Sequence, residues 1–280
     1  MVVNEYDLYE EFEVEKGPGY VGKLTAYLLD NTPEIDPERR RPAVLVCPGG
    51  GYAMTSDREA EAVAVRFLAK GFQAFVLRYS CAPACFPTQL VEASMAMAFI
   101  RRNCEEFMVD RDRVGVIGFS AGGHLAATLS VLYNDHRVFE VFDLEIEENK
   151  PDFSILCYPV TSCDPEISHG VTFDNVSGGN AGIREYLSLE QRVHADVPPT
   201  FLWHTANDSV VNVQNSLLYA GALAACGVPF ELHVFENGVH GLSVADRETT
   251  PPGNPQCYNE NAQQWLPLVF RWLERRELVL

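Results

Sequence analysis

The sequence predicts an α/β fold in which a mostly parallel central sheet is covered by helices on both faces. Short, continuous apolar runs, such as AVLVC at 43–47 and RVGVIGF at 113–119, are typical of strands that are buried on both sides. Longer segments with helical spacing of apolar residues, such as 121–133, lie between these runs. This alternation favours strand–helix–strand units whose parallel strands share one sheet.

The expected elements follow each other in an order that fits such a sheet. The N-terminal segments EYDLYEEFEV and GKLTAYLL, at 5–14 and 22–29, partly alternate polar and apolar residues, which predicts two antiparallel edge strands. Buried strands are then expected at 43–47, 72–79, 113–119, 152–160, 200–205 and 230–235. Helices are expected at 56–71, 90–107, 121–133, 183–193, 213–227 and 259–276. We therefore expect one domain over 1–280, with a small, polar, Gly-rich insertion at about 161–182.

The charge of the chain limits its partners. It has 21 basic and 39 acidic residues, and its net charge is −18. Such a field repels phosphate backbones and anionic lipids, so we expect neither nucleic-acid nor membrane partners. The N-terminus lacks the pattern of a signal peptide, and no apolar run approaches the roughly 18 residues that cross a bilayer. We therefore expect a cytoplasmic protein whose eight cysteines are free thiols; homo-oligomerisation stays open.

A serine lies between glycines in GFSAGGH, at 118–124, directly after an apolar run. The GxSxG pattern between a strand and a helix is typical of a nucleophile elbow, where small neighbours permit a sharp, strained turn. The positive end of a helix starting at Ala121 would favour a developing oxyanion near Ser120. The competing interpretation is a Gly-rich turn without chemistry.

A serine hydroxyl needs a base to take its proton and a third group to orient that base. With this elbow the chain order is Ser, then Asp or Glu, then His. His240 is the histidine that follows the last expected strand, and Asp208 follows the strand at 200–205. Alone, Asp208 could cap a helix and His240 could lie in a surface loop. Their order and their positions at strand ends favour a triad with Ser120.

The loop PGGGY, at 48–52, follows the first buried strand, and its glycines let the backbone approach a ligand closely. A nucleotide-binding loop is excluded, because the loop lacks the Lys-Ser/Thr of a P-loop and Met54 replaces the third glycine of GxGxxG. No spacing of His or Cys residues indicates a metal site. Tyr52, the last residue of this loop, and Phe86 are candidate walls of a substrate site.

Four segments together, at 48–72, 115–129, 198–211 and 228–242, resemble the α/β-hydrolase esterases known as acetyl-xylan or carbohydrate acetyl esterases. The resemblance runs from about residue 41 to 243. It implies the α/β-hydrolase fold, Ser120 as nucleophile, His240 as general base and acid, and Asp208 as its orienting partner. It also implies an oxyanion hole from the backbone N–H groups of Ala121 and of Gly50 and Gly51. Pro48 stands where many lid-bearing lipases carry the histidine of an HGGG motif, which favours the sugar-esterase branch.

These observations predict a serine esterase that releases short acyl groups, with acetyl expected, from a neutral carbohydrate and without a cofactor or metal. The insertion at 161–182 is expected over the site, where its polar residues suit hydroxyl groups better than a long acyl chain. The alternatives are a general short-chain carboxylesterase, a small serine peptidase-like hydrolase and a non-catalytic binding protein on the same scaffold.

Overall fold

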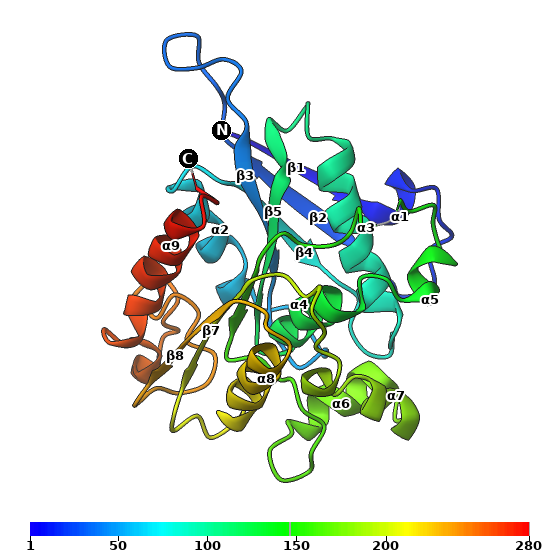
Figure 1. The fold of residues 1–280 in the computed structure, drawn as a ribbon, viewed down its shortest axis with the longest axis vertical. Coiled ribbons are helices and arrows are strands. Elements are labelled where there is room, and N and C mark those ends of the chain that lie inside the picture. Colours follow the sequence, from blue (N-terminus) through cyan, green and yellow to red (C-terminus); the bar gives the residue numbers. More distant parts are fainter. Residues whose placement is uncertain (146, 280) are drawn as a thin grey trace.

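The computed structural model describes residues 1–145 and 147–279, and within them eight strands form one sheet. The sheet order is β1-β2-β4-β3-β5-β6-β7-β8; β1 and β2 pair in antiparallel fashion, and the strands from β4 to β8 are parallel to one another (Figure 1). The strands are β1 (Val2–Asp7), β2 (Lys23–Leu28), β3 (Arg41–Cys47), β4 (Gln73–Arg78), β5 (Val109–Phe119), β6 (Ser154–Cys157), β7 (Thr200–Thr205) and β8 (Phe230–Phe235). The predicted fold class, with its antiparallel N-terminal strands, is therefore confirmed.

Helices cover both faces of the sheet. The helices are α1 (Leu8–Glu11), α2 (Glu61–Leu68), α3 (Thr88–Arg102), α4 (Ala121–Leu132), α5 (His136–Phe139), α6 (Gly170–Ser177), α7 (Ala181–Tyr186), α8 (Gln214–Ala225) and α9 (Trp265–Arg275). Short 3₁₀ turns are η1 (Asp57–Glu59), η2 (Leu189–Gln191), η3 (Pro255–Cys257) and η4 (Ala262–Gln264). Helices α2 and α9 pack on one face, and α3, α4 and α8 pack on the other (Figure 1).

The alternation of side chains along β3 explains why its sequence is apolar throughout. Leu45 belongs to the core beneath α3, α4 and α8, whereas Val44 and Val46 belong to the core beneath α2 and α9. Every residue of β3 is buried. A strand between two helical layers has no solvent-facing side, so its sequence shows no polar–apolar alternation.

Several segments differ from the sequence prediction. Strand β8, at the edge of the sheet, has no buried residue, and the helix expected at 183–193 is divided into α7 and η2. The strand expected at 5–14 ends at Asp7, whose carboxylate accepts a hydrogen bond from the Tyr9 amide at 3.2 Å and so begins α1. Leu8 and Tyr9 are adjacent and both buried, which a two-sided strand with one solvated face cannot provide. The insertion at 161–182 contains α6 and the start of α7. Across the described residues, no helix is both long and apolar enough to cross a membrane.

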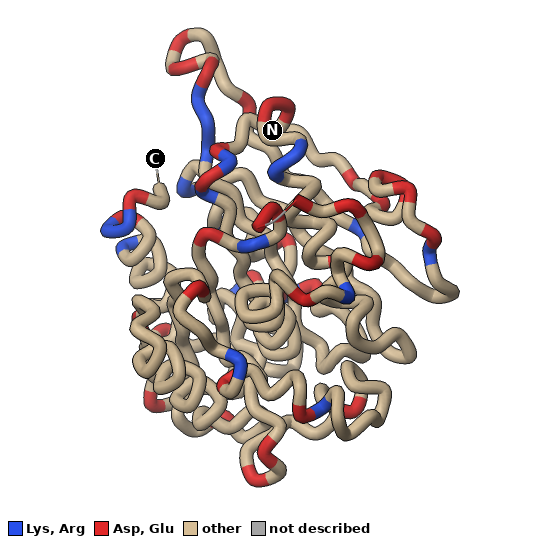
Figure 2. Tube along the Cα trace, turned by 45° about the vertical axis from the view of Figure 1, so that its right-hand side comes forward, with Lys and Arg blue, Asp and Glu red and all other residues tan. Residues whose placement is uncertain are grey.

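Acidic and basic residues lie at many positions along the trace, and they are denser in the upper half of the view in Figure 2. Acidic residues outnumber basic ones by 39 to 21. The parallel strands all end at the side of the molecule where α6 lies, at the bottom of Figure 1. Loops after β3, β5, β7 and β8 therefore meet at this edge, which is where open α/β sheets bind ligands.

Candidate active site

Ser120 occupies a sharp turn between β5 and α4. Its backbone has φ 53° and ψ −118°, a conformation that non-glycine residues rarely adopt and that stores strain. A Cβ on Gly118 would lie 2.0 Å from the Gly122 carbonyl oxygen, and one on Gly122 would lie 2.1 Å from the Cys47 carbonyl oxygen. Larger residues would therefore force the strand and the helix apart. The two glycines of the GxSxG pattern are required by the close packing of this turn.

The structure brings Ser120, His240 and Asp208 together in one hydrogen-bonded chain. His240 Nε2 lies 2.8 Å from Ser120 Oγ, and His240 Nδ1 lies 2.7 Å from Asp208 Oδ2. The three residues follow β5, β8 and β7, respectively. Because a carboxylate can only accept, Nδ1 carries the ring proton and Nε2 is left to accept the proton of the serine hydroxyl.

The Asp208 carboxylate is held in its ionised form. Burial acts to raise its pKa, but the neighbouring His204 and His240 and the backbone amide of Val211 outweigh burial and hold the pKa well below its usual range. Its Oδ1 accepts hydrogen bonds from the amides of Val210 and Val211 at 2.9 and 3.0 Å. His204 Nε2 lies 3.5 Å from Oδ2. Asp208 therefore presents a fixed negative charge to His240.

The loop after β3 passes directly beside Ser120. A Cβ on Gly49 would lie 3.0 Å from the Ser120 Cβ, so the backbone at this point is in contact with the serine. Gly50 and Gly51 have φ of 134° and 64°, both in the region that favours glycine. Within the described part of the chain, the amides of Gly50, Gly51 and Ala121 donate no hydrogen bond to the protein. These three amides lie in the glycine loop and at the start of α4, on the two segments that adjoin Ser120.

Glu59 connects this loop to the loop that carries His240, a connection that the sequence analysis missed. The buried Glu59 carboxylate accepts hydrogen bonds from the Gly49 amide through Oε2 at 2.8 Å and from the Tyr158 hydroxyl through Oε1 at 2.7 Å. The Tyr158 oxygen in turn accepts the Ser243 amide at 2.8 Å. The Tyr158 ring packs edge-on against His240, with ring centres 5.1 Å apart.

Tyr52 and Phe86, the expected walls of a substrate site, are buried instead. Tyr52 has φ 57°, is 1% exposed and donates its hydroxyl proton toward His124 Nδ1 at 2.8 Å. Phe86 is 8% exposed and packs against Tyr186 and the Arg137 guanidinium. Tyr52 therefore has almost no exposed surface, and Phe86 has only a small one. Both aromatic rings pack in the hydrophobic core on the α3, α4 and α8 side of the sheet.

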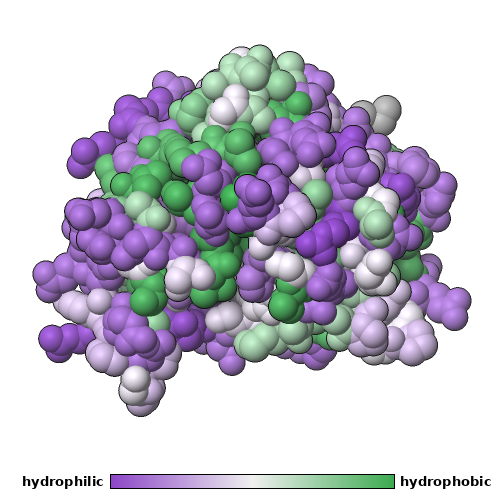
Figure 3. Space-filling view, turned by 90° about the horizontal axis from the view of Figure 1, so that it is seen from below, coloured by the Kyte–Doolittle hydropathy of each residue, from purple (hydrophilic) through white to green (hydrophobic). Residues whose placement is uncertain are grey.

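Seen from the end where the strands terminate, the surface is a mixture of hydrophilic residues and smaller hydrophobic patches (Figure 3). Ser120 is 7% exposed, and the His240 side chain is 15% exposed. The serine and the histidine are therefore close to the surface, whereas the Asp208 side chain is only 1% exposed. No group of three or more His, Cys, Asp or Glu residues in the described ranges is arranged to hold a metal ion.

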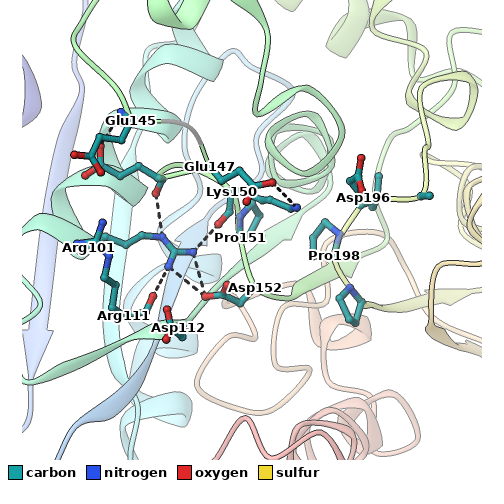
Figure 4. Close-up of a pocket in the computed structure, with 14 residues that line it drawn as sticks. Arg101, Arg111, Asp112, Glu145, Glu147, Lys150, Pro151, Asp152, Asp196 and Pro198 are labelled. Atoms are coloured by element: carbon teal, nitrogen blue, oxygen red, sulfur yellow. Dashed lines mark hydrogen bonds and ion pairs between the residues drawn. The ribbon is translucent and has the colours of Figure 1, made fainter.

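A polar cavity of about 550 Å³ lies at the opposite end of the sheet, near the starts of β6 and β7 (Figure 4). Arg101 crosses it and donates hydrogen bonds to the carbonyls of Arg111, Glu148 and Lys150 and to the Asp152 carboxylate. Through these hydrogen bonds the Arg101 guanidinium stabilises the start of β6. The cavity is thus remote from Ser120, which follows the other end of β5.

Two family models match consecutive parts of the chain. Residues 31–157 match the BD-FAE family, and residues 158–250 match the prolyl oligopeptidase family. The chain is 36% identical to an endo-1,4-beta-xylanase B of Butyrivibrio fibrisolvens, covering 85% of this chain and 37% of that protein. It is 30% identical to an acetylxylan esterase of Xylanibacter ruminicola, covering 71% of this chain and 41% of that protein. The chain thus spans less than half the length of these two curated relatives.

A solved structure matches almost end to end. The acetyl ester-xyloside bifunctional hydrolase of Caldicellulosiruptor lactoaceticus is 33% identical, with a TM-score of 0.83, and the match covers 99% of this chain and 97% of that one. This extent of similarity, on the same fold, is enough to assign the family. The chain belongs to the esterase family of α/β-hydrolases.

Proposed function

We propose that this protein is a serine esterase that hydrolyses short acyl esters, in particular acetyl esters of a neutral carbohydrate. The observation that carries the proposal is the continuous hydrogen-bonded chain from Asp208 through His240 to Ser120. In this proposal Ser120 is the nucleophile, His240 is the general base and acid, and Asp208 orients the imidazole.

In the acylation step, Ser120 Oγ attacks the ester carbonyl carbon while His240 Nε2 takes the hydroxyl proton. Asp208 keeps the proton on Nδ1 and stabilises the imidazolium that forms. As the tetrahedral intermediate collapses, the bond between the carbonyl carbon and the alcohol oxygen breaks. His240 then gives its Nε2 proton to that oxygen, and the free alcohol leaves an acyl group on Ser120.

In the deacylation step, a water molecule takes the place of the alcohol. His240 Nε2 accepts a proton from the water, whose oxygen attacks the acyl carbon, and then returns the proton to Ser120 Oγ. The carboxylic acid leaves and the starting enzyme is restored. In both steps the negative oxygen of the intermediate would be bound by the amides of Ala121, Gly50 and Gly51, aided by the positive end of α4.

The choice of substrate class is supported by two kinds of observation. One relative is an acetylxylan esterase and a similar solved structure is an acetyl ester-xyloside hydrolase. The segment 161–182, which packs on Gly51 through Asn175, is rich in polar residues and has little apolar surface for a long acyl chain. Each buried methylene would contribute about 0.8 kcal/mol only if an apolar groove received it.

A second candidate is hydrolysis of small peptides. The match to the prolyl oligopeptidase family covers residues 158–250, the part of the chain that contains both Asp208 and His240. An amide needs a protonated leaving group, which the same imidazole could supply. Turnover of proline-containing dipeptide anilides at a rate above that of p-nitrophenyl acetate would favour this candidate over an esterase.

The Ser120→Ala variant tests the proposal. We expect kcat for p-nitrophenyl acetate and for acetylated xylo-oligosaccharides to fall by about 10⁴- to 10⁶-fold, since triad deletions have this effect in other hydrolases. Alanine fits the turn, so the thermal unfolding midpoint should change little. Ser130→Ala is the matched control, because it removes a buried hydroxyl from α4, the helix that follows Ser120, where Ser130 Oγ lies 2.6 Å from Ser154 Oγ. Near-normal ester hydrolysis by folded Ser120→Ala would refute the nucleophile.

A further inference from the structure

Helix α6, in the polar segment 161–182, is hydrogen-bonded to the glycine loop 48–52 beside Ser120. Asn175 Nδ2 donates a hydrogen bond to the Gly51 carbonyl oxygen at 2.8 Å. On the other side of Gly51, a Cβ would lie 3.9 Å from His169 Cε1 and 3.9 Å from Thr172 Oγ1. The imidazole of His169, at the start of α6, therefore lies over the bare Cα of Gly51.

The orientation of the His169 ring is fixed by Thr172. His169 Nδ1 and Thr172 Oγ1 are 2.7 Å apart, and Thr172 is fully buried. Within the part of the chain that the structure describes, the Thr172 hydroxyl has no other acceptor, so it donates its proton to Nδ1. Nε2 then carries the ring proton, and no described residue accepts it. His169 thus presents one unpaired N–H donor from a half-exposed ring.

This donor is close to the proposed chemistry. The pKa of His169 is lowered by partial burial and by the charge on His240, whereas the charge on Asp208 acts to raise it. The geometric link to the site is the glycine loop, because the His169 ring overlies Gly51, and Gly49 in the same loop contacts Ser120. A lowered pKa keeps His169 neutral, so that it offers a hydrogen-bond donor and no second positive charge beside His240.

We infer that His169 is a substrate-binding residue whose Nε2–H donates to a hydroxyl or ring oxygen in the alcohol part of the ester. This inference rests on the proposed esterase function and extends it to a residue that selects a polyhydroxylated alcohol. His169 takes no part in proton transfer with Ser120, because His240 already occupies that hydroxyl. An alcohol without oxygen atoms near the ester cannot accept a hydrogen bond from His169 Nε2–H. His169 therefore does not increase the affinity for such an ester.

Two esters separate this role from a structural one. Acetylated xylobiose offers hydroxyl and ring oxygens beside its ester, whereas p-nitrophenyl acetate has a flat aromatic leaving group without them. We expect His169→Leu to lower kcat/KM for acetylated xylobiose by about three- to tenfold, the effect of losing one neutral hydrogen bond, mainly through a higher KM. The kcat/KM for p-nitrophenyl acetate should stay within about twofold. His169→Gln, which keeps an N–H donor, should recover part of the loss.

Two further variants serve as references. Asn175→Ala frees the Gly51 carbonyl and should lower kcat for both esters, because it acts through the loop and not through the alcohol. His136→Ala removes a histidine whose side chain is 71% exposed on α5, away from the site, and should leave both rates unchanged. If His169→Leu unfolds, His169→Ala and His169→Gln allow the same comparison.

Equal losses for the two esters in folded His169→Leu would overturn the inference and assign His169 a structural role. Unchanged rates for both esters would overturn it as well. A different result bears on the proposed function: if the wild-type protein hydrolyses p-nitrophenyl acetate but not acetylated xylobiose, the carbohydrate substrate is wrong, and the inference falls with it. Failure of the carbohydrate proposal is seen in the wild-type protein, whereas failure of the inference alone is seen only in the His169 variants. The two failures can therefore be distinguished.

Discussion

His124, one helical turn beyond Ser120, is a fully buried histidine with both ring nitrogens engaged. Its Nε2 lies 3.1 Å from the Leu187 carbonyl oxygen, to which it must donate, so Nδ1 accepts the Tyr52 hydroxyl proton at 2.8 Å. Burial lowers the pKa of His124 from 6.5 to about 4. The neutral ring therefore anchors Tyr52 beneath the glycine loop, and protonation would break this contact.

This histidine makes the stability of the protein depend on pH. In the unfolded chain His124 would take up a proton below about pH 6.5, whereas the folded protein resists protonation until about pH 4. Protons therefore favour the unfolded state in this window, and stability falls as the pH is lowered. Between pH 7 and pH 5 we expect a loss of about 2 kcal/mol from this residue in the free energy of unfolding.

The His124→Gln variant isolates this effect, because glutamine can still accept from Tyr52 and donate to Leu187 but does not titrate. Urea unfolding at pH 7 and pH 5 should show a smaller decrease in stability for the variant than for the wild type. An equal decrease in both proteins would mean that carboxylates such as Asp208 account for the acid sensitivity.

Individual residues of the site differ in how far the sequence can predict them. The positions of Ser120, Asp208 and His240 follow from local signals, since each lies in the loop or turn after a predicted strand, in a fixed chain order. Glu59 and His169 give no such signal, because their roles depend on contacts with Gly49 and Gly51, which only the tertiary structure creates. The burial of Tyr52 gives no signal either, because it accompanies a positive φ that a sequence does not display.

At the scale of elements, the short turn η1 joins the two loops on which the proposed chemistry depends. Glu59 bonds the Gly49 amide on one side and, through Tyr158, the Ser243 amide on the other. Its neighbour Arg58 donates to the Gly241 and Thr249 carbonyls at 2.8 and 2.7 Å. One turn thus sets the position of the loop after His240 relative to the loop after β3.

We expect Glu59→Gln to lower kcat by about tenfold or more, because a displacement of reacting groups by about 1 Å can cost 10²-fold. KM should change little, since Glu59 does not touch the substrate. Tyr158→Phe removes only the hydroxyl that connects Glu59 to Ser243 and should have the same kind of effect on kcat. Steady-state kinetics with p-nitrophenyl acetate, together with thermal unfolding, provide the measurement.

The matched control is Glu61→Gln, two residues further along and exposed on α2, which should leave kcat unchanged. If Glu59→Gln and Tyr158→Phe lower the unfolding temperature but leave kcat at the wild-type value, η1 has a purely structural role. A fall in kcat without a matching rise in KM supports positioning of the loops.

Elements with a strong apolar pattern were predictable, and those formed by local capping or tertiary packing were not. The strand and helix around Ser120 have continuous apolar sequences, and β5 and α4 lie close to the expected bounds. Helix α6, by contrast, has the sequence GVTFDNVS, which is poor in strong helix formers. It is held by burial of Thr172, Phe173 and Val176 and ends at Gly178 in a left-handed conformation.

For the whole molecule, the order of strands determines which loops meet. Strand β4 lies between β2 and β3, so that β3 pairs with β5 and the glycine loop comes beside Ser120. Strands β6, β7 and β8 come next in the sheet. The loops after their carboxyl ends bring Tyr158, Asp208 and His240 to the same edge. Sequence alone predicts the parallel class but not this order, because strand pairing is a non-local property.

The net charge of −18 should also influence which esters reach this edge. At an ionic strength of 0.01 M the field of the acidic residues extends over about 30 Å, and 0.15 M salt reduces this distance to about 8 Å. The protein therefore repels an anionic ester in dilute buffer and repels it less in salt. The association of a neutral ester does not depend on this field.

The matched pair 4-acetoxybenzoate and its methyl ester tests this effect, because the two share the same acetyl group and differ in charge. We expect kcat/KM for acetate release from 4-acetoxybenzoate to rise by about twofold or more between 0.01 M and 0.15 M NaCl, while the value for the methyl ester stays constant. The reason is that the field acts on the approach of the charged substrate and not on the acyl transfer at Ser120. An equal response of both esters would show that salt changes the enzyme itself. A decrease for the anion alone would indicate that local positive groups, such as Arg58, which donates to the Gly241 carbonyl next to His240, outweigh the overall acidity at the site.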